Sequence, residues 1–352
     1  MKRWLLPVAA AILITAAAGY WLQFVKIKEF TKEAFLMDTL VQITVYHADA
    51  AQGQAALQAA LEEIARISAL TNRFPQAGKE PGEVQRINAN AGIAPVTVGP
   101  DIMEIIKRSL YYGELSHGSF DITVGPLMDL WGFGQEEQRV PSDREINQVL
   151  SLVDYRLVEV DPERMTVYLP KPGMSLDLGG VAKGYATDKA VQKLKEMGIK
   201  HALVNAGGNI YCIGTKPDGG LWRVGIRDPR SEAGMFGVIS VKDVSLVTSG
   251  DNERYFMEDG VRYSHLLDPA TGKQARELMQ TTVMAVSSTD ADILNKPIFV
   301  LGPLQGRILA EELPVEGTLL VTPDKEVIPT GVFKEELKLL ENSGYSIIQH
   351  DN

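Results

Sequence analysis

The chain has 352 residues, of which 45% are hydrophobic and 23% are charged, and such a chain can bury a substantial core. Its formal net charge of -10 opposes the clustered Lys and Arg side chains that bind nucleic-acid phosphates, so DNA- and RNA-binding proteins are excluded. The single cysteine, Cys212, excludes an intramolecular disulfide and a cysteine-rich metal site, and we interpret it as a small buried strand residue.

The first residues differ in character from the rest. Two basic residues precede an uncharged run over residues 4–25, and two more follow it. Because about 20 apolar residues span the hydrocarbon core of a bilayer, residues 1–28 are predicted to form a transmembrane signal anchor, with a folded domain over residues 29–352. Small residues at 16–18 leave a cleavable signal peptide as the alternative.

One strand signal followed by several helix signals makes up the first part of the predicted domain. The β-branched run Leu40–Tyr46 predicts a strand, and Asp49 is predicted to open a helix whose apolar residues recur at three- and four-residue steps. Further helices are predicted over residues 100–115 and from Ser142, which forms a capping-box pattern with Glu145.

Short strands dominate from Leu157 onward. They read LVEV, TVYL, ALVNAGG, IYCIG, LWRVGI and VISV, and the Asp-Gly within residues 257–261 predicts a tight hairpin turn. One helix, over residues 182–197 and ended by Gly198, lies between them. This order predicts an α+β domain with mostly antiparallel sheets and packed helices.

Residues 175–186, SLDLGGVAKGYA, form the first segment that could carry chemistry. A strand, a turn at Gly179-Gly180 and a helix are predicted there, and the unpaired N–H groups at a helix start can bind phosphate. Lys183 adds a cation in the first helical turn. A tight structural turn would also explain the two glycines.

Three further segments place polar side chains beside apolar runs. Within residues 118–131, Asp121 is predicted at a loop-to-strand junction, where it could cap a turn or bind a ligand hydroxyl. His265 precedes an Asp-Pro turn, where it could act as a base, as a cation beside phosphate, or as a structural residue. Asp292 and Lys296 would share one face of a helix, where they could hold a cation or cap the helix.

Several of these segments together, in this order, carry a resemblance. They are Met37-Asp38-Thr39, GSFDITVGP from Gly118, DLGGVAKG from Asp177, HLLDP with Thr271-Gly272 from His265, and Asn205-Ala206-Gly207-Gly208. Over residues 34–340 the chain resembles the ApbE family, the FAD:protein FMN transferases. The resemblance implies a single ApbE-like (T-fold-like) domain that binds FAD and, with magnesium, transfers FMN to a threonine hydroxyl of a partner protein, releasing AMP.

The resemblance also implies which residues line the site. The FAD-binding residues would be Met37, Phe74, Ser119, Phe120, Asp121, Asp177, Lys183 and Leu266. Magnesium would be held near the backbone of Gly180 and by Asp292, Asn295 and Lys296. His265 and Asp292 would be catalytic, with His265 taking the threonine proton or stabilising charge at the reacting phosphate.

Lys296 departs from the family pattern, which usually has a hydroxyl residue at this position. Its ammonium would repel a divalent cation but could pair with Asp292 and with the FAD diphosphate. Alternatively, Lys296 points to solvent and magnesium binds through Asp292, backbone oxygen and water. Pro297, directly after it, predicts that the helix begins or kinks late in this segment.

The resemblance and the N-terminal segment together imply a location and a partner class. We expect a transferase held at the cell membrane, with its folded domain outside the cytoplasm, that acts on a flavoprotein of a membrane electron-transport or reductase system. One alternative is a metal-dependent FAD pyrophosphatase, in which water replaces threonine. The other is a non-catalytic FAD-binding protein that has lost the metal.

Overall fold

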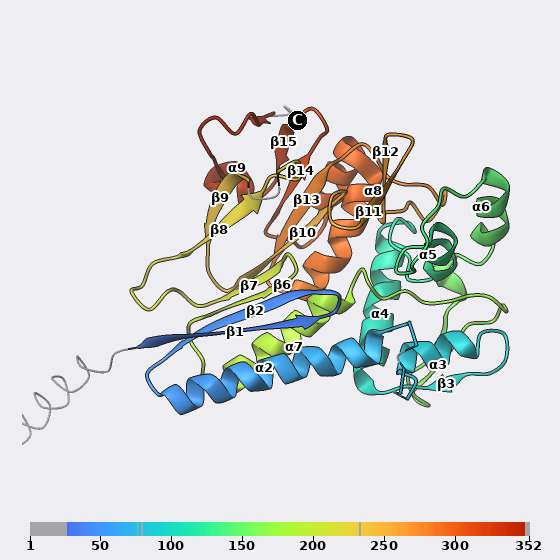
Figure 1. Cartoon of the computed structure of the whole chain (residues 1–352), viewed down its shortest axis with the longest axis horizontal. Coiled ribbons are helices and arrows are strands. Elements are labelled where there is room, and N and C mark those ends of the chain that lie inside the picture. Colours follow the sequence, from blue (N-terminus) through green and yellow to red (C-terminus); the bar gives the residue numbers. More distant parts are fainter. Residues whose placement is uncertain (1–26, 76, 79, 232–233, 349–352) are drawn as a thin grey trace, which may run out of the picture.

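A nine-stranded sheet forms the centre of the computed structural model, which describes residues 27–75, 77–78, 80–231 and 234–348 (Figure 1). Its strands, in spatial order, are β1 (Lys28–Leu36), β2 (Thr39–His47), β6 (Ala202–Ala206), β7 (Asn209–Ile213), β10 (Val244–Gly250), β13 (Gln280–Ala285), β14 (Gly317–Val321), β15 (Glu326–Pro329) and β17 (Ser346–Ile347). All neighbouring strands are antiparallel except β15 and β17. The predicted mostly antiparallel sheet is therefore confirmed.

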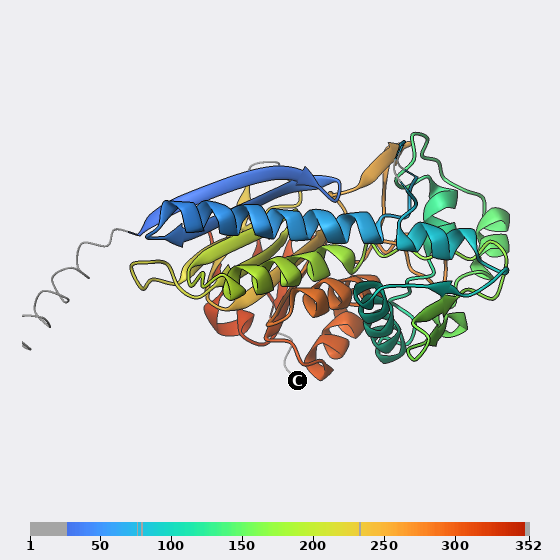
Figure 2. The same ribbon diagram turned by 90° about the horizontal axis from the view of Figure 1, so that it is seen from below.

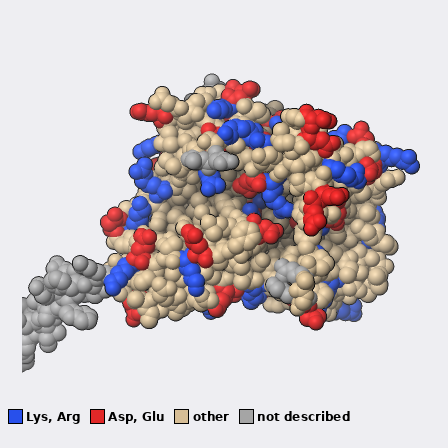
Figure 3. Space-filling model, in the orientation of Figure 1, with Lys and Arg blue, Asp and Glu red and all other residues tan. Residues whose placement is uncertain are grey.

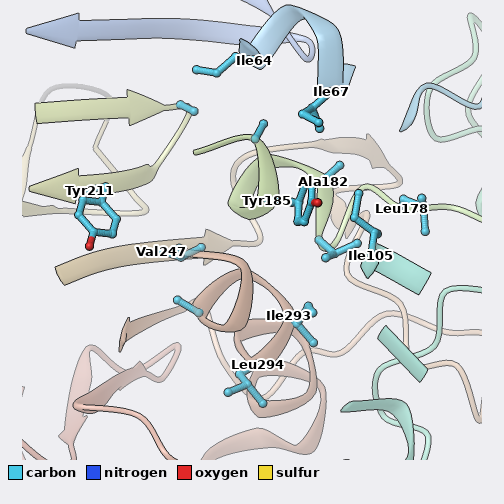
Figure 4. Packing of buried hydrophobic residues seen from close by; sticks show 14 of the residues in the cluster. Ile64, Ile67, Ile105, Leu178, Ala182, Tyr185, Tyr211, Val247, Ile293 and Leu294 are labelled. Atoms are coloured by element: carbon cyan, nitrogen blue, oxygen red, sulfur yellow. The ribbon is translucent and has the colours of Figure 1, made fainter. Parts of the chain in front are cut away.

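Three helices lie side by side across one face of this sheet (Figure 2). They are α2 (Ala50–Thr71), α7 (Ala182–Glu196) and α8 (Ser288–Glu312). Figure 4 shows Ile64 of α2, Tyr185 of α7 and Ile293 of α8 in the buried cluster beneath them. The three- and four-residue spacing of apolar residues places one stripe of each helix in this core.

A smaller sheet covers the opposite face. It consists of β16 (Lys338–Leu339), β9 (Met235–Val241) and β8 (Trp222–Arg227), and the short helix α9 (Phe333–Glu336) contacts it. Phe236 and Phe333 are buried in the apolar layer between the two sheets. Cys212 lies in the same layer, where burial raises the pKa of its thiol to about 12, so its interpretation as a buried strand residue is confirmed.

The remaining elements gather beyond the helical layer (Figures 1 and 2, right). They are α3 (Glu83–Ala89), α4 (Pro100–Leu115), α5 (Gly125–Trp131), α6 (Asp143–Leu150), the 3-10 helix η1 (Tyr155–Leu157), the small sheet of β3 (Val96–Thr97), β5 (Thr166–Tyr168) and β4 (Glu159–Asp161), and the hairpin of β11 (Tyr255–Glu258) and β12 (Val261–Ser264). Trp131 holds the hairpin against α5, because its ring lies 5.8 Å from that of Tyr263. His265 directly follows β12 and is positioned by this packing.

The predicted helix caps and turns are confirmed. Asp49 accepts from the N–H groups of the first turn of α2, and Ser142 and Glu145 form the full capping box of α6. Gly198 adopts φ 79° after α7. The hairpin turn has positive φ at both Asp259 (51°) and Gly260 (76°), the conformation that Asp-Gly sequences favour.

Two predicted strands do not form. Residues 175–178 are extended but have no strand partner, since Leu176 exchanges backbone hydrogen bonds with the side-chain amide of Asn88 (2.7 and 3.0 Å). The loop at Asp121 leads through turns into α5 and not into a strand. Side-chain partners distant in sequence thus replace the ladder bonds that the local pattern predicts.

Strand β1 is one of several strands that the sequence does not predict, and β10, β13, β14 and β15 are others. Phe30, Ala34 and Leu36 pack against the core in an alternating row, but Lys32 interrupts that row and donates to Gln58 of α2. A lysine is typical of an edge strand, where its charge discourages pairing with another chain.

Helix α8 corrects the prediction drawn from Pro297. The helix begins at Ser288, nine residues earlier, and Pro297 lies inside it with helical geometry. The kink is at Gly302 (φ 75°, ψ -171°), directly before Pro303. Asp292 and Lys296 therefore lie one turn apart on a continuous helix, as the predicted shared face requires.

The predicted signal anchor falls almost entirely on residues outside the described part of the chain. Among the helices that the structure does describe, none combines the length and apolar character needed to cross a membrane.

Candidate active site

The candidate residues come together where helix starts and loops meet at one end of the sheet. Lys183 lies in the first turn of α7, Asp292 and Lys296 in the first turns of α8, and His265 after β12. His265 is tied to the loop after β10 by a hydrogen bond from its N–H to the carbonyl of Arg254 (3.0 Å). Figure 3 shows this face hollowed near its centre, close to the tip of the β1–β2 hairpin, with acidic and basic side chains around the hollow.

Asp292 is fully buried between α7 and α8, and both of its carboxylate oxygens are engaged. Oδ2 accepts from the N–H of Gly184 (2.8 Å), and Oδ1 accepts from Nζ of Lys296. The glycine permits this approach, because a Cβ on Gly184 would lie 2.6 Å from Cβ of Asp292 and closer still to the carbonyl oxygen of Ser288. Asp292 thus joins the two helices at their starts.

Lys296 lies against the Gly-Gly turn with 17% of its side chain exposed. A Cβ on Gly180 would be 3.7 Å from Cε of Lys296 and 3.1 Å from the ring of Phe120. Burial lowers the pKa of Lys296, the Asp292 carboxylate opposes that shift, and a bound anion would oppose it further. The predicted pairing of Lys296 with Asp292 is confirmed, and the alternative in which Lys296 points to solvent is wrong.

His265 supplies a neutral imidazole beside these cations. Nδ1 lies 3.2 Å from the carbonyl oxygen of Arg254, and since that oxygen only accepts, Nδ1 carries the proton and Nε2 keeps a lone pair. Burial lowers the pKa of His265 to about 3, and the charges of Arg254, Lys183 and Lys296 add to the shift. The ring is therefore neutral at physiological pH, and a bound diphosphate, as an anion, would raise this pKa and make Nε2 a stronger base.

Asp177 is held by the turn that it opens and by an arginine. Oδ1 accepts from the N–H of Gly179 (2.8 Å), and Oδ2 accepts from Nε of Arg73 (3.3 Å). Arg73 also donates to Asp129 and to the carbonyl oxygen of Gly125 (3.3 Å), and only 7% of its side chain is exposed. This arginine fixes the start of α5 relative to the Gly-Gly turn.

Asp121 closes the loop before α5. Oδ1 accepts from both the N–H and the hydroxyl of Thr123 (2.6 Å each), and Oδ2 accepts from the N–H of Tyr155 (2.8 Å). Burial raises the pKa of Asp121, and these hydrogen bonds oppose the shift. The geometry favours the turn-capping alternative for Asp121, while its neighbours Ser119, half-buried, and Phe120, buried, flank the loop.

Asn295 faces the sheet. Its Nδ2 donates to the carbonyl oxygens of Val247 (2.6 Å) and Thr281 (3.2 Å), and its Oδ1 accepts from the hydroxyl of Thr281. The side chain is fully buried, so its amide is committed to strands β10 and β13. Asn295 therefore sets the height of α8 above the sheet.

Met37, Phe74 and Leu266 lie around the edge of this region. Met37 (φ 53°) lies in the turn between β1 and β2. The side chain of Thr39, two residues later, lies against the Gly207-Gly208 turn. A Cβ on Gly134 would lie 2.6 Å from the Phe74 ring and 3.5 Å from the guanidinium of Arg254. Leu266 is buried in the main core.

The sequence patterns missed Arg73, Glu253 and Arg254. A Cβ on Gly208 would lie 3.6 Å from Oε1 of Glu253, which places this carboxylate beside the Gly207-Gly208 turn. None of the three residues stands in a recognisable motif. The only local signal is that Glu253 and Arg254 follow a polar loop at the end of a strand.

The residues implied as magnesium ligands do not offer a set of free oxygen donors. Both oxygens of Asp292 have protein partners, the amide oxygen of Asn295 faces a strand, and Lys296 itself is a cation. Within the described residues, no group of three or more His, Cys, Asp or Glu side chains is close enough to hold a metal. Because magnesium requires several oxygen ligands, this arrangement does not fit the ion.

A family model described as the ApbE family matches residues 37–319. The chain is 34% identical over 331 residues to the FAD:protein FMN transferase of Treponema pallidum, covering 90% of this chain and 91% of that protein. It is 33% identical over 268 residues to the FAD:protein FMN transferase of Klebsiella pneumoniae, covering 76% and 83%.

Solved structures agree with these sequence relatives. The ApbE protein of Thermotoga maritima superimposes with a TM-score of 0.80 at 34% identity, covering 87% of this chain and 98% of that chain. The apo form of the flavinyl transferase ApbE of Pseudomonas stutzeri gives a TM-score of 0.72 at 28% identity, covering 87% and 94%.

Proposed function

The chain belongs to the ApbE family, and we propose that it transfers FMN from FAD to a threonine hydroxyl of a partner flavoprotein and releases AMP. The observation that carries this proposal is the convergence of Lys183 and Lys296 on a Gly-Gly turn at a helix start, beside the neutral imidazole of His265. A diphosphate needs the cations and the backbone N–H groups, and a hydroxyl nucleophile needs the base.

The reaction requires one proton transfer and one displacement at phosphorus. Nε2 of His265 takes the proton of the threonine hydroxyl, and the threonine oxygen bonds to the FMN phosphorus. The bond from that phosphorus to the bridging oxygen breaks, and AMP leaves with that oxygen. Lys183 and Lys296 offset the negative charge on the diphosphate oxygens, which is the main demand of phosphoryl transfer.

The other residues of the site position these groups. Asp292 fixes the ammonium of Lys296, and the carbonyl of Arg254 fixes the tautomer of His265. Asp177 and Arg73 hold the Gly-Gly turn in place, where FAD polar groups would lie. Magnesium, which the resemblance implies, has no role in these steps, because the oxygens that would bind it already have partners.

Mass spectrometry tests the proposal. The purified protein is incubated with FAD and a domain that carries an acceptor threonine, and an added mass of FMN on the acceptor with release of AMP supports transfer. AMP with free FMN and no adduct would instead identify a pyrophosphatase. Intact bound FAD would identify a binding protein.

A histidine pair provides a matched comparison. His265→Gln is expected to slow transfer by about 100-fold or more, the usual contribution of a general base, while FAD still binds. His201 also bonds a backbone carbonyl through Nδ1 (2.6 Å to Thr215), but it lies at the far end of β6, so His201→Gln should leave transfer unchanged. Equal rates for the two variants would contradict the role of His265.

We further propose that the protein is anchored at the cell membrane and acts outside the cytoplasm, on a flavoprotein of a membrane electron-transport or reductase system. The uncharged run over residues 4–25, flanked by basic residues, supports the anchor. Protease added to spheroplasts should remove the folded domain. Protection until the membrane is lysed would overturn this placement.

A further inference from the structure

We propose that the ammonium of Lys296 is a built-in cation that takes the place of the metal, so that this protein binds the FAD diphosphate without a divalent ion. The proposal rests on the function proposed above. The residues that the resemblance implies as magnesium ligands make contacts that do not suit a metal ion.

Asp292 already has a protein donor at each of its carboxylate oxygens. Its Oδ1 accepts from Nζ of Lys296, and its Oδ2 accepts from the N–H of Gly184 on the neighbouring helix. Nζ also donates to the carbonyl oxygen of Asp292 (3.0 Å), so the ammonium is fixed at two points. Each oxygen of this carboxylate therefore already has a protein donor, and the ammonium beside Oδ1 repels a second cation.

The side chain of Lys296 lies beside the Gly-Gly turn. The stem of Lys296 passes the place where a Gly180 side chain would be, with Cε and Cγ 3.7 and 3.8 Å from that point. The same turn leads into the start of α7, where Lys183 lies and where the N–H groups of Ala182 and Gly184 already have protein acceptors. An anion bound at this helix start therefore meets two ammonium groups, from α7 and from α8.

The side-chain amide of Asn295 is bonded to the sheet and is not free to bind a metal. A metal site needs ligands that can turn toward the ion, but the Asn295 amide is buried and bonded to two strands. Turning it toward Asp292 would leave the hydroxyl of Thr281 and the carbonyl of Val247 without these partners, which is costly in a buried layer. The helix is thus fixed in the orientation that presents Lys296.

FAD binding to the full protein, measured by calorimetry in EDTA and in millimolar magnesium, tests the proposal. Wild type should bind FAD equally well, within twofold, in both buffers. Lys296→Thr should bind FAD roughly 10-fold or more weakly in EDTA, since hydrogen bonds to charged groups contribute about this much, and magnesium should restore its binding. Riboflavin, which lacks phosphate, should bind the variant and wild type alike.

Two further variants control for charge and for folding. Lys193→Thr makes the same change on the exposed side of α7 and should leave FAD binding unchanged in both buffers. Because Lys296→Thr leaves Asp292 buried without its partner, the double variant Asp292→Asn with Lys296→Met removes both charges. It should bind FAD weakly in EDTA with no recovery in magnesium.

The outcomes separate the two proposals. If wild type binds FAD only with magnesium, or if Lys296→Thr binds as tightly as wild type in EDTA, the built-in cation is overturned while the transferase function stands. If wild type binds no FAD in either buffer, both proposals are overturned. Manganese gives an independent measurement, since wild type should show no paramagnetic signal of a bound ion at this site and Lys296→Thr should gain one.

Discussion

Replacement of Gly184 by alanine tests the close contact that positions Asp292. The added Cβ would lie 2.6 Å from Cβ of Asp292, far inside the optimal separation of carbon atoms, and nearer still to the carbonyl oxygen of Ser288. A backbone oxygen cannot rotate away as a side chain can. Helices α7 and α8 must therefore separate by about 1 Å, a distance set by the ~3.5 Å contact minimum.

The expected effect on stability follows from two opposing terms. Overpacking of this kind costs about 1–3 kcal/mol, and the backbone clash places Gly184→Ala at the upper end. Alanine in a helix interior offsets about 1 kcal/mol of this loss. We therefore expect the free energy of unfolding to fall by about 2 kcal/mol, with a longer hydrogen bond from Gly184 to Asp292.

Urea unfolding followed by circular dichroism measures this change. Lys193→Ala, an exposed substitution in the same helix, should change the free energy of unfolding by no more than about 0.5 kcal/mol. FAD affinity should also fall in Gly184→Ala, because Lys183 and Lys296 move apart with their helices. A Gly184→Ala protein that is as stable as wild type would refute the argument, since it would show that the helix contact gives way without cost.

Three more predictions follow from individual hydrogen bonds and one pKa. Asp121→Asn should lower the free energy of unfolding by about 1–3 kcal/mol, because an amide NH2 replaces an oxygen that accepts from a buried N–H. Asp161→Asn should cost less, because the exposed Asp161 carboxylate accepts both of its N–H bonds through one oxygen. Urea unfolding compares the two variants. Arg73→Met should lower stability by about 2–3 kcal/mol and weaken FAD binding, because Asp177 loses a charged partner, and an unchanged unfolding midpoint would contradict this. In the folded protein the pKa of His265 is lowered to about 3 from its ordinary 6.5, so between these pH values only the unfolded chain binds this proton. The free energy of unfolding should therefore fall as pH drops from about 6.5 toward 3. His265→Gln should flatten that part of the pH profile measured without FAD, and an unaltered profile would argue against the shift.

Local sequence signals identified several helices and strands of the fold, but not the central strands β10, β13, β14 and β15. The Asp49 cap, the Ser142–Glu145 capping box and the Asp-Gly turn depend on contacts within a few residues, so a short window of sequence contains the whole interaction. The sequence did not predict strand β1, because Lys32 breaks its apolar alternation and donates a hydrogen bond to Gln58, 26 residues away. The strand predicted over residues 175–178 does not form for a similar reason. The backbone of Leu176 bonds the side-chain amide of Asn88, 88 residues away, and not a neighbouring strand.

The family and the segments of the site could be recognised from the order of motifs, because each motif is a continuous run of residues. Their partners could not. Arg73 joins Asp177 across 104 residues, and Gly184 joins Asp292 across 108, and neither pairing leaves a mark in the local pattern. Asp121 and Asn295 stand in motif positions that imply ligand contacts, yet the structure commits both side chains to the protein itself.

Sequence alone determined that this chain has an α+β fold of antiparallel strands and helices, and it identified Lys296 as a departure within a recognisable motif. It left open whether that lysine pairs with Asp292 or points to solvent. Only the tertiary structure decided this, because the answer depends on Gly184, which brings α7 against α8, and on Asn295, which fixes how α8 faces the sheet. A side chain's direction on a helix follows from its position in the chain, but what it meets there follows from the packing of elements far apart in sequence.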